Sequence, residues 1–410
     1  MIGAWSGLLL VVLGAVLAAP ALVAVGIIVG LVWVARSPWA RFELRGLTYE
    51  RRLSAGRAVV GETIGLDLVV HNPKLLPVPW LEVEDFVSVE ARVDGRELER
   101  SELPGFAILR TTWTVGPFER VTRRLRIVAD RRGLYQLDAT RLQVADLFAQ
   151  RSEAHEETGP RLHYRVVPRS LSVRAAVPVS LLPGATRTRR GLFEDPALFA
   201  GVRPYQPGDP LRRVHWKATA RLHRPVSRRL DPAHAAELVI ACDAQTVPGP
   251  FWLRHYDDDL VESLYTTAMS LARELVDSGV ACGLAANGYG TLRQRSLYLP
   301  PSAASAQVVR IADELAALSR SASRPFAGLL AELGRRTPPA TAVLALSARD
   351  PADFLPVLRR LAAMGRPVRL VALGPDAAVA VASARAAGIA AQRAVLEPDW
   401  RTADALALAD

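Results

Sequence analysis

Residues 237–243 read ELVIACD, an apolar run that ends in a carboxylate. The same pattern returns along the rest of the chain, where short apolar runs alternate with longer amphipathic ones. The further apolar runs are VACGLAA (280–286), TAVLALS (341–347) and PVRLVALG (367–374), and the helical segments between and after them are 257–279, 305–318, 351–365 and 376–388, followed by a short last strand and helix. Continuous apolar strands separated by helices predict a parallel sheet covered on both faces. We therefore expect a doubly wound α/β domain over residues 236–410.

The segment from residue 42 to residue 150 has a different period. In TIGLDLVV (63–70) every second residue is apolar, which predicts a strand with one buried face. VTRRLRIVA (121–129) repeats the alternation, and turn sequences such as HNPK and VDGRE separate the strands. This spacing is typical of an antiparallel sandwich. We predict an immunoglobulin-like β-sandwich domain.

Residues 2–35 contain no charged side chain, and Pro20 lies near their middle. A run of this length predicts a transmembrane hairpin over residues 1–36, with a single bent span or a cleaved signal peptide as alternatives. Arginines dominate residues 36–57, and the positive-inside rule then places the soluble body in the cytoplasm. The expected location is the cell membrane, with lipids contacted through this N-terminal anchor.

The formal net charge of the 410-residue chain is +10. For a membrane-anchored protein, anionic lipid or an acidic protein explains this excess better than nucleic acid does. The only two cysteines, Cys242 and Cys282, lie in apolar runs without metal-ligand spacing. We expect two buried core thiols and neither a disulfide nor a zinc site.

Between these domains, residues 161–235 form a basic segment. Its most specific part is GVRPYQPGDPLRRVHWKATARLHRPVSRRL (201–230). Asp209 followed by Pro210 predicts the start of a helix. On that helix Arg213, Lys217 and Arg221 are spaced by four and form a basic stripe.

Three interpretations of this segment remain open. In a structural one, Asp209 caps the helix and pairs with Arg203 or Arg212, while Trp216 is a core anchor. In a docking one, the stripe binds an acidic partner or anionic headgroups. In a catalytic one, Asp209 and His215 act together, although no Ser or Cys nucleophile stands at a suggestive spacing.

The spacing of this segment resembles the signature of the domain of unknown function 58 family. The matching residues are Arg203, Tyr205, Gly208, Asp209, Arg212, His215, Trp216, Lys217 and Arg221. Arg132-Gly133-Leu134-Tyr135 and Asp146-Leu147-Phe148 also fit the family's pattern. The resemblance implies a C-terminal domain similar to a von Willebrand factor A domain, and a MoxR-type AAA+ ATPase as partner in chaperone-like assembly or maturation. It implies no catalytic activity and no cofactor.

One departure from the pattern concerns metal binding. A von Willebrand factor A domain that binds Mg²⁺ carries Asp-x-Ser-x-Ser after its first strand, whereas this chain has Asp243-Ala244-Gln245-Thr246-Val247. Asp350 follows a later strand and is the candidate for a further carboxylate. We expect a degenerate site at Asp243 without a functional metal, and we interpret Asp257, Asp258 and Asp259 as a helix start.

These observations lead to one functional hypothesis and two alternatives. The hypothesis is a membrane-tethered, non-enzymatic scaffold that presents a docking surface to a MoxR-type ATPase or its client. The alternatives are a hydrolase that uses Asp209 and His215, and a module that binds anionic lipid or nucleic acid.

Overall fold

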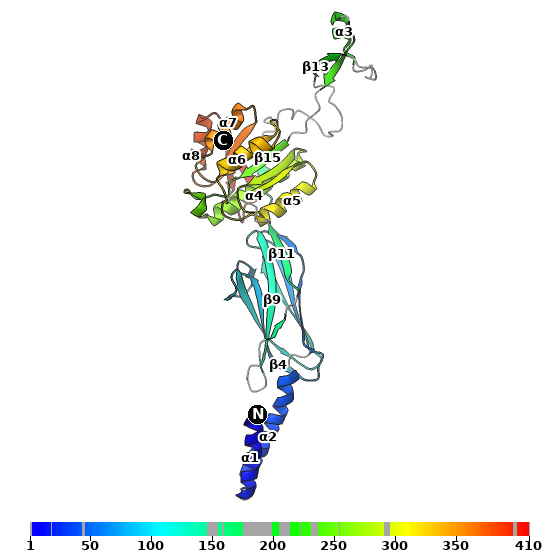
Figure 1. Ribbon diagram of the computed structural model, residues 1–410, viewed down its shortest axis with the longest axis vertical. Coiled ribbons are helices and arrows are strands. Elements are labelled where there is room, and N and C mark those ends of the chain that lie inside the picture. The colour runs from blue at the N-terminus through cyan, green and yellow to red at the C-terminus, as the bar shows by residue number, and fades with distance from the viewer. Residues whose placement is uncertain are drawn as a thin grey trace. The chain divides into compact units, whose positions relative to one another are not determined.

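The computed structural model describes residues 2–17, 19–42, 46–145, 155–157, 160–174, 199–204, 214–222, 224–230, 237–253, 255–290, 296–396 and 400–409. The chain divides into two compact units, Met1–Val166 and Val167–Asp410 (Figure 1).

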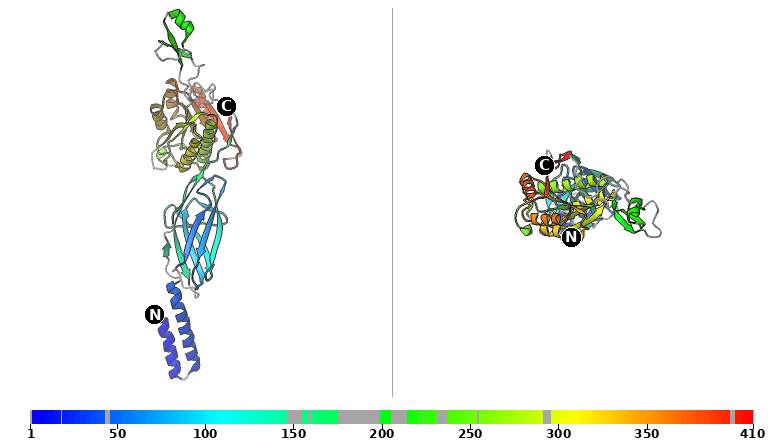
Figure 2. Two further views of the ribbon diagram at one scale, coloured as in Figure 1. Left: turned by 90° about the vertical axis from the view of Figure 1, so that its right-hand side faces the viewer. Right: turned by 90° about the horizontal axis from the view of Figure 1, so that it is seen from above.

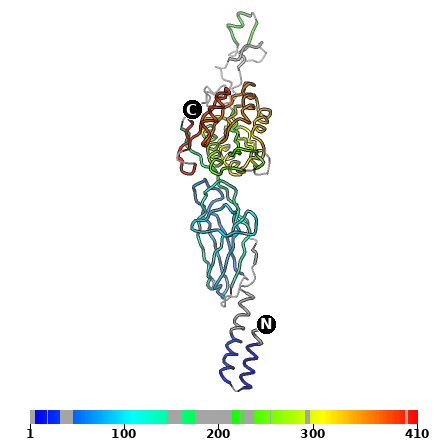
Figure 3. The backbone as a smooth tube through the Cα atoms, turned by 90° about the vertical axis from the view of Figure 1, so that its left-hand side faces the viewer, coloured from blue at the N-terminus to red at the C-terminus, as the bar shows by residue number. Residues whose placement is uncertain are grey.

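The first unit begins with two antiparallel helices, α1 (Ile2–Val16) and α2 (Pro20–Phe42), which lie side by side (Figure 3). Glycine allows the two backbones to approach closely. A Cβ atom on Gly14 would lie 2.7 Å from the backbone nitrogen of Val23, and one on Gly26 would lie 2.6 Å from that of Val11. Larger side chains at Gly14 or Gly26 would therefore force the helices apart.

The prediction of a transmembrane hairpin over residues 1–36 is wrong. No helix in the described part of the chain is long and apolar enough to cross a membrane. The 15 residues of α1 reach about 22 Å, whereas the hydrocarbon core of a bilayer is about 30 Å thick. Arg36 and Arg41 interrupt the apolar sequence of α2.

The rest of the first unit confirms an immunoglobulin-like sandwich of two antiparallel sheets. One sheet has the order β1-β3-β8-β5 and the other β2-β11-β9-β4-β7-β6, with β10 beside β9. The strands of the first sheet are β1 (Thr48–Leu53), β3 (Thr63–His71), β5 (Arg92–Val93) and β8 (Arg120–Val128). Those of the second are β2 (Arg57–Val59), β4 (Val78–Ser88), β6 (Glu99–Arg100), β7 (Phe106–Val115), β9 (Gly133–Ala145), β10 (His155–Glu157) and β11 (Leu162–Val167).

The alternation in TIGLDLVV has the predicted effect on burial. Ile64, Leu66, Leu68 and Val70 of β3 are each no more than 1% exposed. At about 25 cal/mol per Å² of apolar surface, burial of four such side chains is a main source of the sandwich's stability.

A buried ion pair joins the two sheets of the sandwich. Arg51 of β1 contacts the Asp85 carboxylate of β4 at 3.3 Å, and the side chains of the two residues are 3% and 0% exposed. Tyr49 and Thr140 donate hydrogen bonds of 2.5 and 2.8 Å to the same carboxylate. Arg51 also donates to the carbonyl of Asp138 at 2.7 Å. The charges are therefore compensated on both sides of the interface, as burial requires.

The second unit confirms the predicted α/β domain. Its eight-stranded sheet has the order β12-β21-β20-β19-β18-β15-β16-β17, and the five strands from β20 to β16 are parallel. The strands are β12 (Ser172–Arg174), β15 (Glu237–Cys242), β16 (Ala281–Ala286), β17 (Leu297–Ser302), β18 (Ala342–Ser347), β19 (Val368–Ala372), β20 (Ala390–Leu396) and β21 (Ala405–Ala409).

Helices cover both faces of this sheet (Figure 2). They are α4 (Asp258–Asp277), α5 (Ala306–Ala317), α6 (Phe326–Arg336), α7 (Leu355–Ala363) and α8 (Ala377–Ala386), with a short 3-10 helix η3 (Phe251–Leu253). Val239 and Ala241 of β15 share one core cluster with α6, α7 and α8. Because successive strand residues point to opposite faces, Leu238 and Ile240 are buried on the other side, where α4 packs. Cys242 and Cys282 are buried thiols, as predicted.

Parts of the predicted basic segment, residues 161–235, belong to these two sheets. β11 pairs with β9 of the sandwich, and β12 pairs in parallel with β21 of the α/β domain. The signature itself contributes a separate two-stranded sheet, β13 (Phe199–Pro204) and β14 (Val226–Leu230), with the helix α3 (Trp216–Leu222) between them in sequence.

Two predicted helices differ from the structure. The last segment of the chain is the strand β21 and not a helix, because it pairs with β20 and buries Leu406 and Leu408 on one face. The signature helix was expected from Asp209. The structure instead begins it at Trp216, because Val214 is in a β-bridge and the amide of His215 donates to the carbonyl of Val226 at 2.9 Å.

The neighbouring arginines of β1 provide a test of the ion pair between the sheets. Arg51→Ala leaves the Asp85 carboxylate buried without its cation, and we expect the sandwich to lose about 3–5 kcal/mol. Arg52→Ala is the matched control, because the Arg52 side chain is 63% exposed and pairs with the exposed Glu50, so its loss costs about 0–1 kcal/mol. Hydrogen–deuterium exchange of peptides from β3 and β4 measures this stability separately from the α/β domain. Equal protection in the two variants would contradict the prediction.

Candidate functional site

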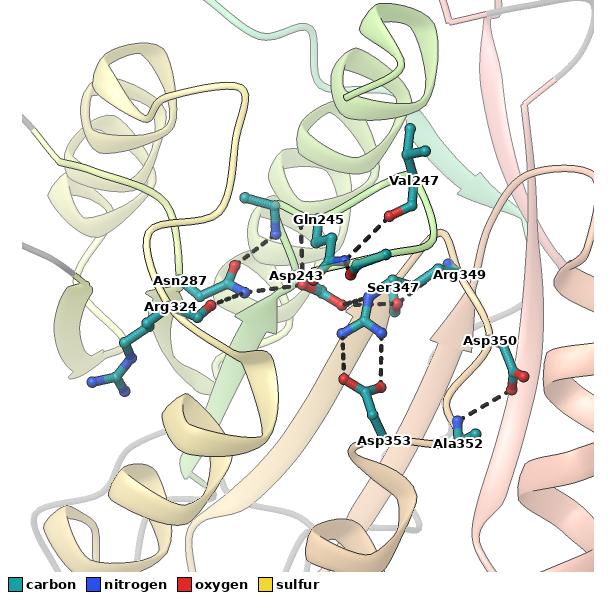
Figure 4. Close-up of polar contacts among 12 residues, drawn as sticks. Asp243, Gln245, Val247, Asn287, Arg324, Ser347, Arg349, Asp350, Ala352 and Asp353 are labelled. Atoms are coloured by element: carbon teal, nitrogen blue, oxygen red, sulfur yellow. Dashed lines mark hydrogen bonds and ion pairs between the residues drawn. The ribbon is translucent and has the colours of Figure 1, made fainter. Parts of the chain in front are cut away.

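The candidate site lies where three parallel strands end. Asp243 follows β15, Asn287 follows β16, and Ser347 is the last residue of β18 (Figure 4). β16 and β18 lie on opposite sides of β15, so the direction of winding reverses at β15. Such a switch point, at the carboxyl ends of the strands, is where α/β sheets bind their ligands.

Asp243 is completely buried and accepts four hydrogen bonds. Its Oδ1 accepts from Asn287 Nδ2 at 3.0 Å and from the backbone amide of Gln245 at 3.2 Å. Its Oδ2 accepts from Ser347 Oγ at 3.2 Å and from Arg349 Nε at 2.8 Å. Three loops of the α/β domain are therefore tied to one carboxylate.

Arg349 joins this carboxylate to a second one. Its Nη1 and Nη2 donate to the two oxygens of Asp353 at 2.7 and 3.1 Å, and this fork adds geometric specificity to the ion pair. The Arg349 side chain is 9% exposed and that of Asp353 is 52% exposed. The guanidinium carbon also lies 5.3 Å from the centre of the Phe354 ring. Arg349 is thus held on three sides.

Burial and pairing act in opposite directions on these groups. Burial raises the pKa of Asp243, although the Arg349 charge and the hydrogen bonds from Asn287 and Gln245 oppose the increase. Burial would lower the pKa of Arg349, but the charges of Asp243 and Asp353 outweigh this effect and the pKa is raised. A proton on Asp243 would displace one of its four donors. The pair is therefore a carboxylate and a guanidinium.

A divalent metal ion does not fit this arrangement. The amide of Gln245 donates to the carbonyls of Val247 and Gly249 at 3.2 and 2.5 Å, so it closes its own loop. A hard divalent cation requires oxygen ligands, whereas the groups facing Asp243 are nitrogen and hydroxyl donors. Across the described residues, no group of three or more His, Cys, Asp or Glu could hold a metal ion.

The other acidic candidates, Asp350 and Asp257, accept hydrogen bonds from backbone amides. Asp350 is exposed and accepts from the amide of Ala352 at 3.1 Å, so it is not the carboxylate that faces this site (Figure 4). Sequence reasoning missed both Arg349 and Asp353, which flank Asp350. Asp257 accepts from the amide of Leu260 at 3.0 Å and caps α4, as a helix start predicts.

The structure describes part of the signature. Tyr205, Gly208, Asp209, Arg212 and Arg213 lie outside the described residues. Arg203 is in β13, opposite Ser227 of β14. His215, Trp216, Lys217 and Arg221 lie at or within α3.

His215 has a local structural role. Its Nδ1 accepts a hydrogen bond of 3.1 Å from the amide of Ala218, which is the third residue of α3. This is the position that an N-cap side chain normally satisfies.

Trp216 is not a core anchor. Its side chain is 66% exposed, and the neighbouring Lys217 and Arg221 are exposed as well. We call Trp216, Lys217 and Arg221 the α3 surface. The structural interpretation of Trp216 is therefore wrong.

The cap can be tested without a partner. The Ala218 amide also donates to the carbonyl of His215 at 2.9 Å, so His215→Ala removes only its side-chain acceptor. We expect this change to cost up to roughly 1 kcal/mol of helix stability, whereas His215→Asn keeps a side-chain acceptor and should cost less. Hydrogen–deuterium exchange of residues 214–222 measures the difference. Equal exchange in the two variants would show that His215 does not cap α3.

Comparison with known proteins gives one family and weak structural likenesses. No curated protein is significantly similar to the chain. Among solved structures, the CARDB domain of a Pyrococcus furiosus protein in complex with di-metal ions is 16% identical, over 30% of this chain and 87% of that chain, with a TM-score of 0.20.

Two further solved structures have similarly low sequence identity and TM-score to this chain. A cohesin module from a Clostridium perfringens family 33 glycoside hydrolase is 11% identical over 30% of this chain and 96% of that chain, with a TM-score of 0.19. A β-glucosidase from Listeria innocua is 8% identical over 30% of this chain and 16% of that chain, with a TM-score of 0.18. Similarities this low carry no argument about function.

The family match is more specific. It covers residues 201–366, which include the described part of the signature, Asp243 and Arg349. The resemblance derived from the signature is confirmed over this range, and residues 201–366 of the chain match the family described as protein of unknown function DUF58.

Proposed function

We propose that the protein is a non-enzymatic interaction protein that docks onto an acidic surface of a MoxR-type AAA+ ATPase or of its client. The family match over residues 201–366 and the partner implied by the sequence resemblance support this choice. In the same proposal, the α/β domain is similar to a von Willebrand factor A domain, with Asp243 at the end of its first central strand.

The observation that carries the proposal is the exposure of Trp216 and two cations on one short helix. The helix α3 presents Trp216, Lys217 and Arg221 to solvent. Tryptophan and arginine are enriched among the residues that dominate the binding energy of protein interfaces. An exposed aromatic side chain and two cations on the same helix therefore favour a partner surface that offers an apolar contact and acidic groups.

The geometry at Asp243 does not suit a general base. All four hydrogen bonds to its carboxylate come from within the domain. A general base needs access to a substrate proton, and Asp243 is completely buried. His215, named in the hydrolase alternative, uses Nδ1 to cap α3.

A binding measurement with purified ATPase tests the proposal. We expect Trp216→Ala to weaken binding at least tenfold, because a truncated hot-spot residue costs more than about 1.4 kcal/mol. The control is Trp252→Ala, since Trp252 is 68% exposed but lies in η3. Normal binding by Trp216→Ala, or no binding by the unmodified protein, would refute the proposal.

The charge of the α3 surface has its own test. Changing Lys217 and Arg221 together to Ala should weaken binding and reduce its dependence on ionic strength, because screened attraction between exposed charges is lost. Arg359→Ala is the control, because Arg359 is exposed on α7. If the double variant instead loses affinity for anionic vesicles or nucleic acid while ATPase binding is unchanged, one of the alternative ligands is correct.

A further inference from the structure

Two loops meet at one end of the β-sandwich. Residues 72–77 join β3 to β4, and residues 116–119 join β7 to β8. Val78 at the start of β4 pairs with Val115 at the end of β7, so both loops lie at the same end of the second sheet. We call residues 72–77 and 116–119 the tip loops.

The buried Asn72 fixes the tip loops to each other. Its side chain donates from Nδ2 to the carbonyls of Leu76 and Gly116 at 2.9 and 2.8 Å. The backbone amide of Phe118 also donates to the carbonyl of Lys74 at 3.0 Å. The tip loops therefore form one element with a defined geometry and not two independent turns.

This element exposes two large apolar side chains. Leu75 is 74% exposed and Phe118 is 67% exposed. Phe118 has a φ of 53°, and among the described residues no other non-glycine residue has a positive φ. A bulky residue is strained in this region, and such strain is found where function requires it. Folding alone therefore does not explain an aromatic residue at position 118.

The chain from α2 enters the sandwich beside the tip loops. A Cβ atom on Gly46 would lie 3.6 Å from Cγ of Pro73. Thr48, the first residue of β1, pairs with His71, which directly precedes the tip loops. The helices α1 and α2 carry the uncharged run 2–35 and expose large apolar side chains of their own. Apolar surface therefore continues from these helices to the end of the sandwich that they join.

Positive charge gathers at the same end. Arg36, Arg41 and Arg45 stand between the uncharged run and β1, together with a single acidic residue, Glu43. Arg120 directly follows the tip loops, and its side chain is 55% exposed. Exposed apolar side chains next to cations fit an anionic lipid surface, because acyl chains take up the apolar groups below a layer of negative headgroups.

We propose that the tip loops insert Leu75 and Phe118 into an anionic lipid surface, with Arg120 and the arginines before β1 at the level of the headgroups. The proposal concerns contact with a lipid surface and not a crossing of the bilayer. It involves the first unit of the chain alone and is independent of the proposed ATPase.

This contact would orient the sandwich. A flexible connection to α2 alone would let the sandwich rotate freely above the lipid. Insertion of two side chains from the tip loops adds a second point of attachment, so the opposite end of the sandwich, where β7 begins, must face away from the lipid. Residues at the two ends should therefore differ in their contact with acyl chains.

The experiment measures this difference with a fluorophore that responds to an apolar environment. It is attached to the full chain through Leu75→Cys or Phe118→Cys, because Cys242 and Cys282 are buried and do not compete for the label. With vesicles of phosphatidylcholine and phosphatidylglycerol, both positions should show a blue shift and should be quenched by lipids brominated on their acyl chains. Vesicles without phosphatidylglycerol should give a smaller shift, because the attraction of the arginines to the headgroups is lost.

Leu103→Cys is the matched control. Leu103 is also an exposed leucine in a loop of the sandwich, but it precedes β7 and lies at the opposite end. Its label should show neither the shift nor the quenching.

Phe118→Gly separates lipid contact from folding. Glycine adopts a positive φ without strain, so the hydrogen-exchange protection of β3 and β4 should not fall. Quenching of the label at Leu75→Cys should weaken in this background, because one of the two inserted side chains is lost.

Several results would overturn the proposal. These are quenching at Leu103→Cys equal to that at the tip loops, no quenching at either tip position, and equal shifts with and without phosphatidylglycerol. A clear loss of protection in Phe118→Gly would show that Phe118 serves the fold. A blue-shifted label before vesicles are added would show that a second copy of the chain covers the tip loops, and this too would overturn the proposal.

Discussion

The loops at the carboxyl ends of β15, β16 and β18 are ordered around one buried negative charge. Asp243 directly follows the first strand of the parallel core, where burial removes the water that would otherwise stabilise its carboxylate. The protein supplies donors from the loops after β16 and β18, through Asn287 and Arg349. Satisfying that charge therefore also fixes the two neighbouring loops, which the helices α4 to α8 alone would leave unconnected.

The strands of both domains could be predicted, because burial of one or both faces of a strand produces a regular pattern of apolar residues in the sequence. β3 alternates and β15 is continuously apolar, and the burial of each follows this pattern. β21 was missed because alanine and leucine favour helices in isolation. Its alternation of small and large residues, with Leu406 and Leu408 buried, was the available signal, and antiparallel pairing with β20 decided the outcome.

The candidate site was predictable only in part. The position of Asp243 follows from the end of a strand, but its partner Arg349 lies 106 residues away and is brought to it by the order of the strands. Trp216 was expected in a core because tryptophan is highly buried on average. The type of a residue does not determine which residues surround it in the fold. Here the helix α3 begins at Trp216 itself, directly after the cap formed by His215.

The excess of positive charge has two different uses in this chain. Arg51 and Arg366 are buried, and the side chain of Arg349 is only 9% exposed. All three are satisfied by carboxylates or carbonyls of their own domain, so their charges are unavailable to a partner. Cations that could attract a partner must therefore be exposed, as Lys217 and Arg221 are. The formal net charge of +10 is accordingly a poor guide to binding by itself. The α3 surface exposes two cations and an aromatic side chain on one short helix, so that electrostatic attraction and apolar burial can contribute to binding by the same element.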